Sequence, residues 1–93
     1  MAIVVIQEFP ATLEQYEAVN AELDSRSDPP EGLIIHTGGQ VGDGMRVIDV
    51  WESEGAWQQF LNDRLVPAVT KVAGEDAPEA QIEVAELHNV FTP

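Results

Sequence analysis

Residues 32–53 read GLIIHTGGQVGDGMRVIDVWES, and this stretch decides the fold. Two apolar runs flank a glycine-rich segment, which predicts a β-hairpin with strands at residues 33–37 and 45–52. Three of its residues are unusual for a plain hairpin, namely His36, Asp49 and Trp51. Which of them lie together depends on the register of the two strands.

A tight turn about Gly42 and Asp43 sets that register. It pairs Val41 with Gly44 and, counting outward, His36 with Asp49 and Ile34 with Trp51. Directly opposed residues project from the same face of a sheet. One face is therefore predicted to carry Ile34, His36, Val47, Asp49 and Trp51, and the other Ile35, Thr37, Ile48 and Val50. We expect the first set to face helices and the second to form a dry interface with another sheet.

The N-terminal part of the chain predicts a strand followed by a helix. Residues 2–9 are rich in β-branched side chains, and Pro10 ends the strand because it cannot donate to a ladder. Thr12 with Gln15 three residues later forms a capping-box pattern. A helix from there to about residue 24 would bury a stripe made of Leu13, Tyr16, Val19, Asn20 and Leu23.

The second half predicts another helix and a last strand. Ser53 is a suitable N-cap, and the apolar stripe then consists of Trp57, Phe60, Leu61, Leu65, Ala68, Val69 and Val72. Pro67 lacks an N–H and disfavours helix at the preceding residue, so we expect a kink or break near residues 64–66. Residues 81–87 alternate polar and apolar as a strand, and a tail, HNVFTP, follows.

The predicted order is βαββαβ, the ferredoxin-like arrangement, in which a four-stranded antiparallel sheet carries two helices on one face. With an acidic loop at residues 73–80 and no internal repeat, residues 1–93 form a single domain of the α+β class. The strands carry apolar residues on both sides, as in IVVI and VIDV, which predicts that the second sheet face is also covered. A homodimer packed sheet to sheet would cover it, with the tail reaching across to the partner.

The composition excludes several classes of function. The chain has 17 acidic and 4 basic side chains and a formal net charge of -13, which opposes binding to nucleic acids and anionic membranes. It has no cysteine, so disulfides and thiolate chemistry are excluded. The opening MAIVVIQEF has an apolar run of only five residues, no basic start and no small-residue cleavage site, so we interpret it as a strand and expect a cytoplasmic protein.

The predicted pairing of His36 with Asp49 has two interpretations. A carboxylate beside an imidazole selects one tautomer and stabilises the protonated ring, as a general base requires, so His36 and Asp49 are the candidate catalytic residues. A cross-strand hydrogen bond that only satisfies two buried groups would need the same residues. Sequence alone leaves both interpretations open.

Aromatic residues and the second histidine allow further readings. Tyr16, Trp57 and Phe60 lie on the inward helix stripes, where they line either a cavity for an aromatic ligand or a filled core. His36 and His88 belong to opposite edges of the predicted sheet, so we predict no shared metal site. Ser53 forms no recognisable catalytic spacing with the His–Asp pair.

The segment VIDVWES (residues 47–53) leading into AWQQFL (residues 56–61) resembles the dimeric α+β barrel superfamily, in particular the small antibiotic biosynthesis monooxygenases. Through the order of its elements, the resemblance extends over the whole chain. It implies a homodimer whose protomers each hold a cavity between sheet and helices. It also implies oxygenation of an aromatic or polyketide-like substrate without cofactor, by deprotonation and then electron transfer from the carbanion to dioxygen.

The resemblance also implies roles for particular residues. Trp51 matches a cavity-lining tryptophan that closes the third strand. Gln7 is the nearest match to an asparagine late in the first strand, and it is a longer amide. Haem-binding relatives place a histidine on the second helix, where this chain has none, so we predict no cofactor. The substrate-binding set is then Gln7, Tyr16, Ile34, Trp51, Trp57 and Phe60.

Three hypotheses for function follow. In the first, the protein is a cofactor-independent monooxygenase-like protein with His36 as general base and Asp49 as its orienting partner. In the second, it is a non-catalytic dimeric binding or structural module. In the third, it is an isomerase or cyclase that uses the same base without oxygen. The sequence does not decide whether the protein is an enzyme.

Overall fold

The structure is a computed structural model that describes residues 1–75, 77 and 79–93. Its elements, in chain order, are β1 (Ile3–Phe9), α1 (Leu13–Leu23), β2 (Leu33–Val41), β3 (Gly44–Trp51), α2 (Glu54–Phe60), a π-helical segment η1 (Leu61–Leu65), α3 (Val66–Ala73) and β4 (Gln81–Glu86). This confirms the predicted βαββαβ order. The loop predicted at residues 73–80 includes residues 76 and 78, which lie outside the described residues.

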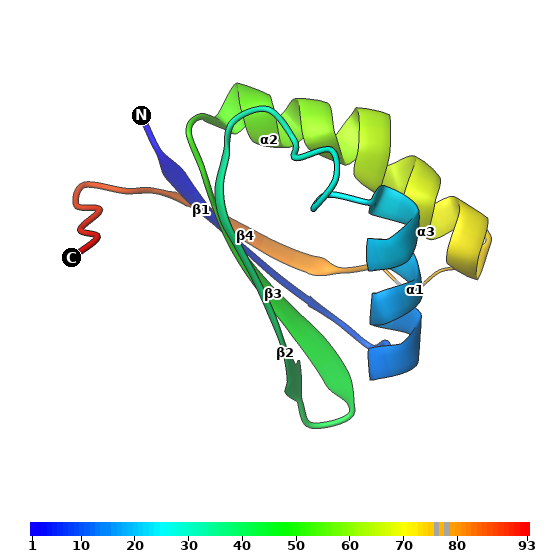
Figure 1. Cartoon of the computed structure of the whole chain (residues 1–93). Helices are drawn as coiled ribbons and strands as arrows, with labels where there is room; N and C mark the ends of the chain where they lie inside the picture. The colour runs from blue at the N-terminus through cyan, green and yellow to red at the C-terminus, as the bar shows by residue number, and fades with distance from the viewer. Residues whose placement is uncertain (76, 78) are drawn as a thin grey trace.

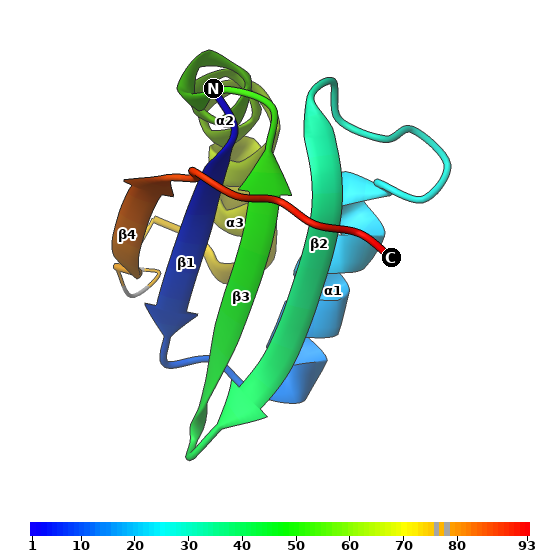
Figure 2. The ribbon, with the colours of Figure 1, turned by 90° about the vertical axis from the view of Figure 1, so that its left-hand side faces the viewer.

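The four strands form one sheet in the order β2-β3-β1-β4, with every neighbouring pair antiparallel. The helices cover one face of this sheet (Figure 1). Figure 2 looks onto the opposite face, in front of which the C-terminal tail passes. The predicted ferredoxin-like α+β fold is therefore confirmed. Within the part of the chain that the structure describes, no helix combines the length and the apolarity needed to cross a bilayer.

The hairpin of β2 and β3 has the predicted register over most of its length. Val41 pairs with Gly44 and His36 pairs with Asp49, as counted outward from the turn at Gly42 and Asp43. The strand β2 continues to Val41, so the prediction that it ends at residue 37 was wrong. Because the turn consists of only two residues, the hydrogen-bonded ladder continues as far as the residues that flank the turn. Gly38 and Gly39 are therefore part of the strand.

The predicted pair of Ile34 with Trp51 was also wrong. A β-bulge between Leu33 and Ile35 shifts the register, and Leu33 is the residue opposite Trp51. A bulge places two residues of one strand against one of its neighbour, so the alternation of faces slips there. Leu33 consequently packs against the core, whereas Ile34 is 47% exposed.

Both helices begin at the caps that the sequence indicates. The Thr12 hydroxyl accepts from the Gln15 backbone N–H at 3.1 Å, and the Gln15 side-chain oxygen accepts from the Thr12 N–H at 2.9 Å. This completes the capping box of α1. The Ser53 hydroxyl accepts from the Ala56 N–H at 3.1 Å at the start of α2. Side chains thereby satisfy three backbone N–H groups at the starts of these helices.

The predicted irregularity of the second helix is confirmed and takes the form of a π-helical turn. This segment, η1, comes directly before α3, whose first turn contains Pro67. Pro67 has no N–H to donate to the preceding turn of an α-helix. The helix accommodates this with one wider, π-helical turn and does not end there. The helix thus continues across the sheet as α2, η1 and α3 (Figure 1).

The core is an aromatic cluster between the sheet and the second helix. Trp51 from β3 packs against Trp57 and Phe60 of α2, with ring centroids 5.9 Å and 5.0 Å away. Ile3 and Val5 of β1 complete the cluster. Trp51 and Trp57 are at most 1% exposed. This cluster holds α2 against the sheet at the start of β1 and the end of β3.

Gly32 and Gly42, which lie before β2 and in the hairpin turn, allow a test of how closely the backbone approaches α2. Both have positive φ, 86° and 58°, but a Cβ on Gly32 would lie 2.5 Å from the Ala56 Cβ, whereas one on Gly42 meets nothing within 4 Å. We expect Gly42→Ala to lower the free energy of unfolding by about 1–2 kcal/mol through backbone strain. Gly32→Ala should lower the free energy of unfolding by about 1–3 kcal/mol more than Gly42→Ala, because its methyl group would overpack against Ala56. Urea denaturation measures both, and equal losses would contradict the predicted contact with α2.

Candidate functional site

The centre of the candidate site is the pair of His36 on β2 and Asp49 on β3. Their side chains project toward the helices, and His36 Nδ1 lies 2.6 Å from Asp49 Oδ1. The carboxylate is buried, with a side chain 4% exposed, whereas the imidazole is 39% exposed. A buried carboxylate is stable only when paired. The histidine therefore has one nitrogen anchored inside the protein and an imidazole ring that solvent still reaches.

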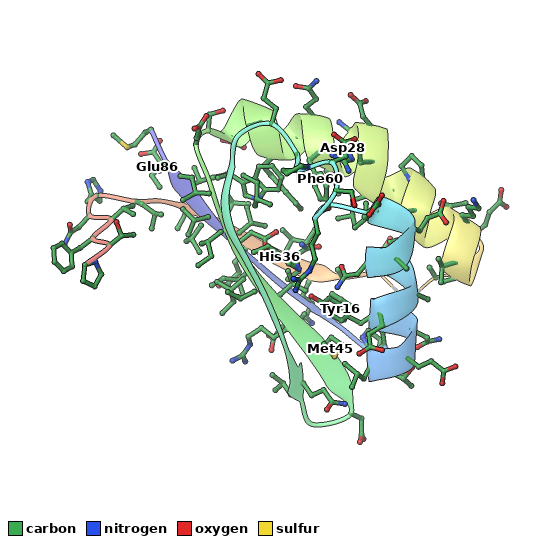
Figure 3. All side chains as sticks on the ribbon, viewed as in Figure 1. Tyr16, Asp28, His36, Met45, Phe60 and Glu86 are labelled. Atoms are coloured by element: carbon green, nitrogen blue, oxygen red, sulfur yellow. The ribbon has the colours of Figure 1, made fainter. Side chains whose placement is uncertain are left out.

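Tyr16 of α1 contacts the other nitrogen of the same ring. The Tyr16 hydroxyl lies 2.9 Å from His36 Nε2, and the two rings are nearly parallel, with centroids 6.4 Å apart and planes inclined by 17°. Figure 3 shows the two side chains in the space between α1 and the sheet. The sequence predicted Tyr16 only as a lining residue, so its bond to His36 is a feature that sequence reasoning missed.

Gly38 provides the space for the Tyr16 ring. It lies two residues after His36 on the same strand and therefore on the same face, opposite Val47. A Cβ built on Gly38 would lie 2.6 Å from the Tyr16 Cζ and closer still to its hydroxyl oxygen. A glycine inside a strand commonly marks a close approach of this kind. The glycine was therefore a signal in the sequence that could have indicated the contact.

The surroundings of His36 raise its pKa above the usual 6.5. The main cause is the hydrogen bond to Asp49, and the negative charge of that carboxylate adds to it. Partial burial of the ring and the positive charge of Arg26 act in the opposite direction. The net effect favours the imidazolium form, because the carboxylate stabilises the extra proton more than desolvation penalises it.

Hydrogen-bond chemistry assigns the protons in this chain of three residues. An ionised Asp49 only accepts, so His36 Nδ1 carries a hydrogen. In the neutral ring, Nε2 is then the acceptor, and the Tyr16 hydroxyl donates to it. The three side chains form a continuous path from the buried carboxylate to a phenol at the edge of α1. Such a path can take up one proton and hold it on the imidazole.

Gln7 of β1 lies on the same sheet face, one row of residues away from the pair. It is 7% exposed and pairs with Val47, the residue that Gly38 opposes across the hairpin. Its role in binding a substrate stays a prediction.

The aromatic residues predicted to bind substrate lie deeper in the protein than the His36 ring. Trp51, Trp57 and Phe60 pack on one another and are at most 8% exposed, so they form core in this structure. The Trp51 indole Nε1 is buried and has no acceptor among the described residues. A buried N–H of this kind is usually satisfied by a water or a ligand oxygen. Ile34, displaced by the bulge, lies away from Trp51 and is exposed.

Ser53 and the two histidines lie on different parts of the fold. Ser53 caps α2 through its hydroxyl, and its hydrogen bond is made to the Ala56 backbone. His36 lies on β2, which is one edge strand of the sheet. His88 comes just after β4, which is the other edge strand. Among the described residues, no three histidine or acidic side chains gather closely enough to hold a metal ion.

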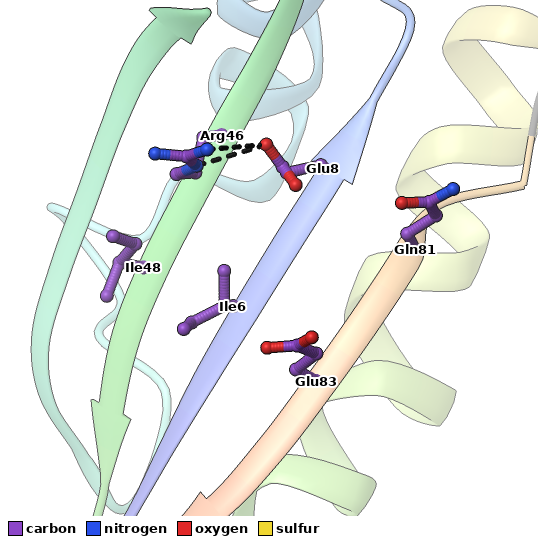
Figure 4. Close-up of a pocket in the computed structure, with 6 residues that line it drawn as sticks. All are labelled: Ile6, Glu8, Arg46, Ile48, Gln81 and Glu83. Atoms are coloured by element: carbon purple, nitrogen blue, oxygen red, sulfur yellow. Dashed lines mark hydrogen bonds and ion pairs between the residues drawn. The ribbon is translucent and has the colours of Figure 1, made fainter.

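The sheet face opposite the site contains a shallow hollow of about 250 Å³ (Figure 4). It is lined by Ile6, Glu8, Arg46, Ile48, Gln81 and Glu83. The Arg46 guanidinium donates to one oxygen of Glu8 at 2.8 Å and 3.1 Å, which closes one end of the hollow. Because His36 projects from the other face, this hollow is distinct from the cavity that the resemblance implies between sheet and helices.

Comparison with solved structures finds close matches to the whole fold. SnoaB, a cofactor-independent oxygenase from Streptomyces nogalater, matches with a TM-score of 0.72 at 16% identity over 99% of this chain and 98% of its own. An antibiotic biosynthesis monooxygenase-like protein from Chloroflexus aurantiacus matches at 0.69 and 17% identity, over 99% and 98%. A protein of unknown function from Nitrosomonas europaea matches at 0.70 and 21% identity, over 99% and 94%.

No known protein family and no curated protein matches the sequence itself. The likeness is therefore one of fold, at identities too low to carry an activity from one chain to another. The chain shares its fold with these solved structures, some of which are described as antibiotic biosynthesis monooxygenases or as a cofactor-independent oxygenase.

The hydrogen bond to Asp49 can be tested through the pKa of His36. We expect Asp49→Asn to lower that pKa, because it removes the acceptor and the negative charge that raise it. Imidazole C–H shifts followed by NMR across pH give the value directly, and His88 in the tail is an internal control in the same spectra. An unchanged His36 titration would contradict the assigned cause.

The same pair predicts how stability depends on pH. The folded-state pKa of His36 is raised above about 6.5, so its contribution is fully present below that pH and is lost as the pH rises through the folded pKa. We expect the difference in unfolding free energy between the wild type and Asp49→Asn to shrink from pH 6 to pH 9. A difference that stays constant or grows over this range would show that His36 protonation is not coupled to folding.

Proposed function

We propose that the protein is a small homodimeric ligand-cavity protein that acts as a cofactor-independent monooxygenase on an aromatic or polyketide-like substrate. The observation that carries the proposal is the anchored and accessible histidine. Its Nδ1 is bound to a buried carboxylate at 2.6 Å, while 39% of the side chain remains exposed. The fold it shares with a cofactor-independent oxygenase supports the same reading.

The proposed chemistry begins with removal of a proton from an acidic C–H or phenolic O–H of the substrate. His36 is the general base of the site, and Asp49 holds its tautomer and stabilises the imidazolium that forms. The resulting carbanion gives an electron to dioxygen, the two radicals combine, and the hydroperoxide loses water to give a carbonyl. For an anthrone, the balance is a CH₂ group plus O₂ giving C=O plus H₂O, so dioxygen is the only oxidant required.

Trp51 and Gln7 are proposed to position substrate and dioxygen above the sheet. The Trp51 N–H supports this role, since it is a buried donor that finds no acceptor among the described residues and that a ligand oxygen or a water would satisfy. The Gln7 amide lies one row along the same face. Tyr16 is proposed to provide the helix side of the cavity and Ile34 its rim, while the buried Trp57 and Phe60 support that wall from within the core.

The dimer is proposed to form through the sheet face that the helices leave uncovered. Ile35 and Ile48 on that face are 53% and 37% exposed, next to half-buried Val4 and Ile6 of β1. The C-terminal tail projects on the same side (Figures 1 and 2), and its Phe91 is 80% exposed. An apolar sheet face of this kind is normally covered by another layer. A second copy packing face to face would bury it and give the tail a surface to bind.

A non-catalytic module is the second candidate, favoured by the tight packing of the aromatic core. Trp51 and Trp57, which the first proposal uses as cavity residues, are at most 1% exposed. In this case His36→Ala and Asp49→Ala would lower stability by about 1–3 kcal/mol through an unpaired buried partner. No ligand would then shift the melting temperature. The same base without oxygen would serve an isomerase or cyclase, which product analysis separates.

Oxygen uptake with anthrone and quinol substrates tests the catalytic proposal. We expect the wild type to consume oxygen with anthrone and to release the corresponding quinone. His36→Ala should lose about 100-fold or more in kcat, as is usual when a general base is removed. Replacement of His88, which lies in the tail, is the matched control. Equal turnover by wild type and His36→Ala would exclude the catalytic role.

Sedimentation tests the proposed dimer. We expect the wild type to sediment as a dimer and Ile48→Glu as a monomer, because the new carboxylate would be buried in the interface. Val66→Glu is the matched control, since Val66 is 50% exposed on α3, on the opposite side of the molecule. The net charge of -13 on each protomer should make association stronger as salt rises. A wild type that remains monomeric in high salt would contradict the interface.

A further inference from the structure

Both nitrogens of the His36 ring are occupied in this structure. Nδ1 is bound to Asp49 at 2.6 Å and Nε2 to the Tyr16 hydroxyl at 2.9 Å. A substrate could reach Nε2 only by displacing the phenol. The Tyr16 oxygen, in contrast, still has acceptor capacity while it donates to Nε2. The phenol is therefore the member of the chain that can meet a ligand without breaking a bond already made.

We propose that Tyr16 is the catalytic residue that exchanges the proton with the substrate, and that His36 and Asp49 act behind it as its base and counter-charge. This rests on the proposed function, in which the ligand is a phenolic or carbon acid. As the substrate proton moves to the Tyr16 oxygen, the Tyr16 proton passes to His36 Nε2. The sum is one proton transferred from the substrate to the imidazole, with no other reactant consumed.

The chemistry of the proposed ligand suits this order. A quinol is a phenol, as Tyr16 is, so exchange of a proton between the two oxygens is nearly balanced in energy. In an anthrone the proton leaves the CH₂ carbon instead, and the negative charge that remains is delocalised onto the ketone oxygen. The positive charge then forms on His36, beside a carboxylate that is 4% exposed. Such a charge pair strengthens as water is excluded. In this relay Tyr16 contacts the ligand, and His36 holds the transferred proton.

Three separate features place the phenol at this position. The capping box fixes the start of α1 one turn before Tyr16. Gly38 leaves the sheet surface open beneath the ring, where a Cβ would lie 2.6 Å from Tyr16 Cζ. Near-parallel stacking on His36 orients the ring. A tyrosine that only filled space would not need a hydroxyl aligned with His36 Nε2.

Gly38 allows a test that moves the phenol without removing any functional group. Gly38→Ala places a methyl group against the Tyr16 ring, so it should shift the hydroxyl away from Nε2. Gly39→Ala is the matched control, because a Cβ there meets nothing within 4 Å and projects from the other face. Tyr16→Phe removes the hydroxyl and keeps the ring. Sedimentation and melting curves confirm that all variants have the fold and the association state of the wild type.

The first readout is anthrone turnover followed by oxygen uptake. We expect kcat to fall about 100-fold in Tyr16→Phe and substantially in Gly38→Ala, while Gly39→Ala behaves as the wild type. Wild-type turnover in Tyr16→Phe together with loss in His36→Ala would overturn the relay and leave the proposed function standing. His36 would then be the residue that meets the substrate.

The second readout requires no turnover. Binding of 2-naphthol is compared with that of its methyl ether, 2-methoxynaphthalene, which lacks the hydroxyl proton. We expect the wild type and Gly39→Ala to prefer the naphthol about three- to tenfold, as one hydrogen bond allows, and Tyr16→Phe to lose the preference. Preference without oxygen uptake would overturn the oxygenase proposal alone. No preference in the wild type, or one that survives Tyr16→Phe, would overturn the relay.

Discussion

The two-residue turn at Gly42 and Asp43 is the constraint on which the site depends. From it the ladder of β2 and β3 runs back without interruption from Val41 to Ile35. This register places His36 directly across from Asp49. A slip by one residue would turn one of the two side chains toward the opposite face. A turn that accepts φ of 58° at Gly42 therefore determines whether the imidazole meets a carboxylate.

The carboxylate is in turn the reason why the histidine is held so firmly. Asp49 lies on a central strand under the helices, where an unpaired charge would be costly. His36 lies on an edge strand, so its ring can satisfy the carboxylate and still reach solvent. The combination of a buried acceptor and an edge-strand donor makes an anchored, accessible base. The positive charge of Arg26 moderates the resulting rise in the pKa of His36.

The aromatic core and the polar chain of Tyr16, His36 and Asp49 occupy different parts of the same sheet face. Trp51, Trp57 and Phe60 pack at the end of β3, where they fix the second helix. The polar chain lies toward the middle of the sheet, under the first helix. The β-bulge at Ile34 divides the two regions, since it lets Leu33 join the aromatic core while His36 keeps its place opposite Asp49. The packed aromatic core thus lies at one end of this sheet face and the polar chain further along it.

The sequence by itself determined the order of elements, the caps at Thr12 and Ser53, the disturbance before Pro67 and the pairing of His36 with Asp49. These follow from local chemistry, because a cap spans three residues and a tight hairpin counts outward with a period of two. It did not show the bulge at Ile34, which depends on how Leu33 packs into the aromatic core. Only the tertiary structure decided that Tyr16 reaches His36 over Gly38. That contact depends on how far α1 is translated and rotated across the sheet, and the spacing of apolar residues leaves those quantities undetermined.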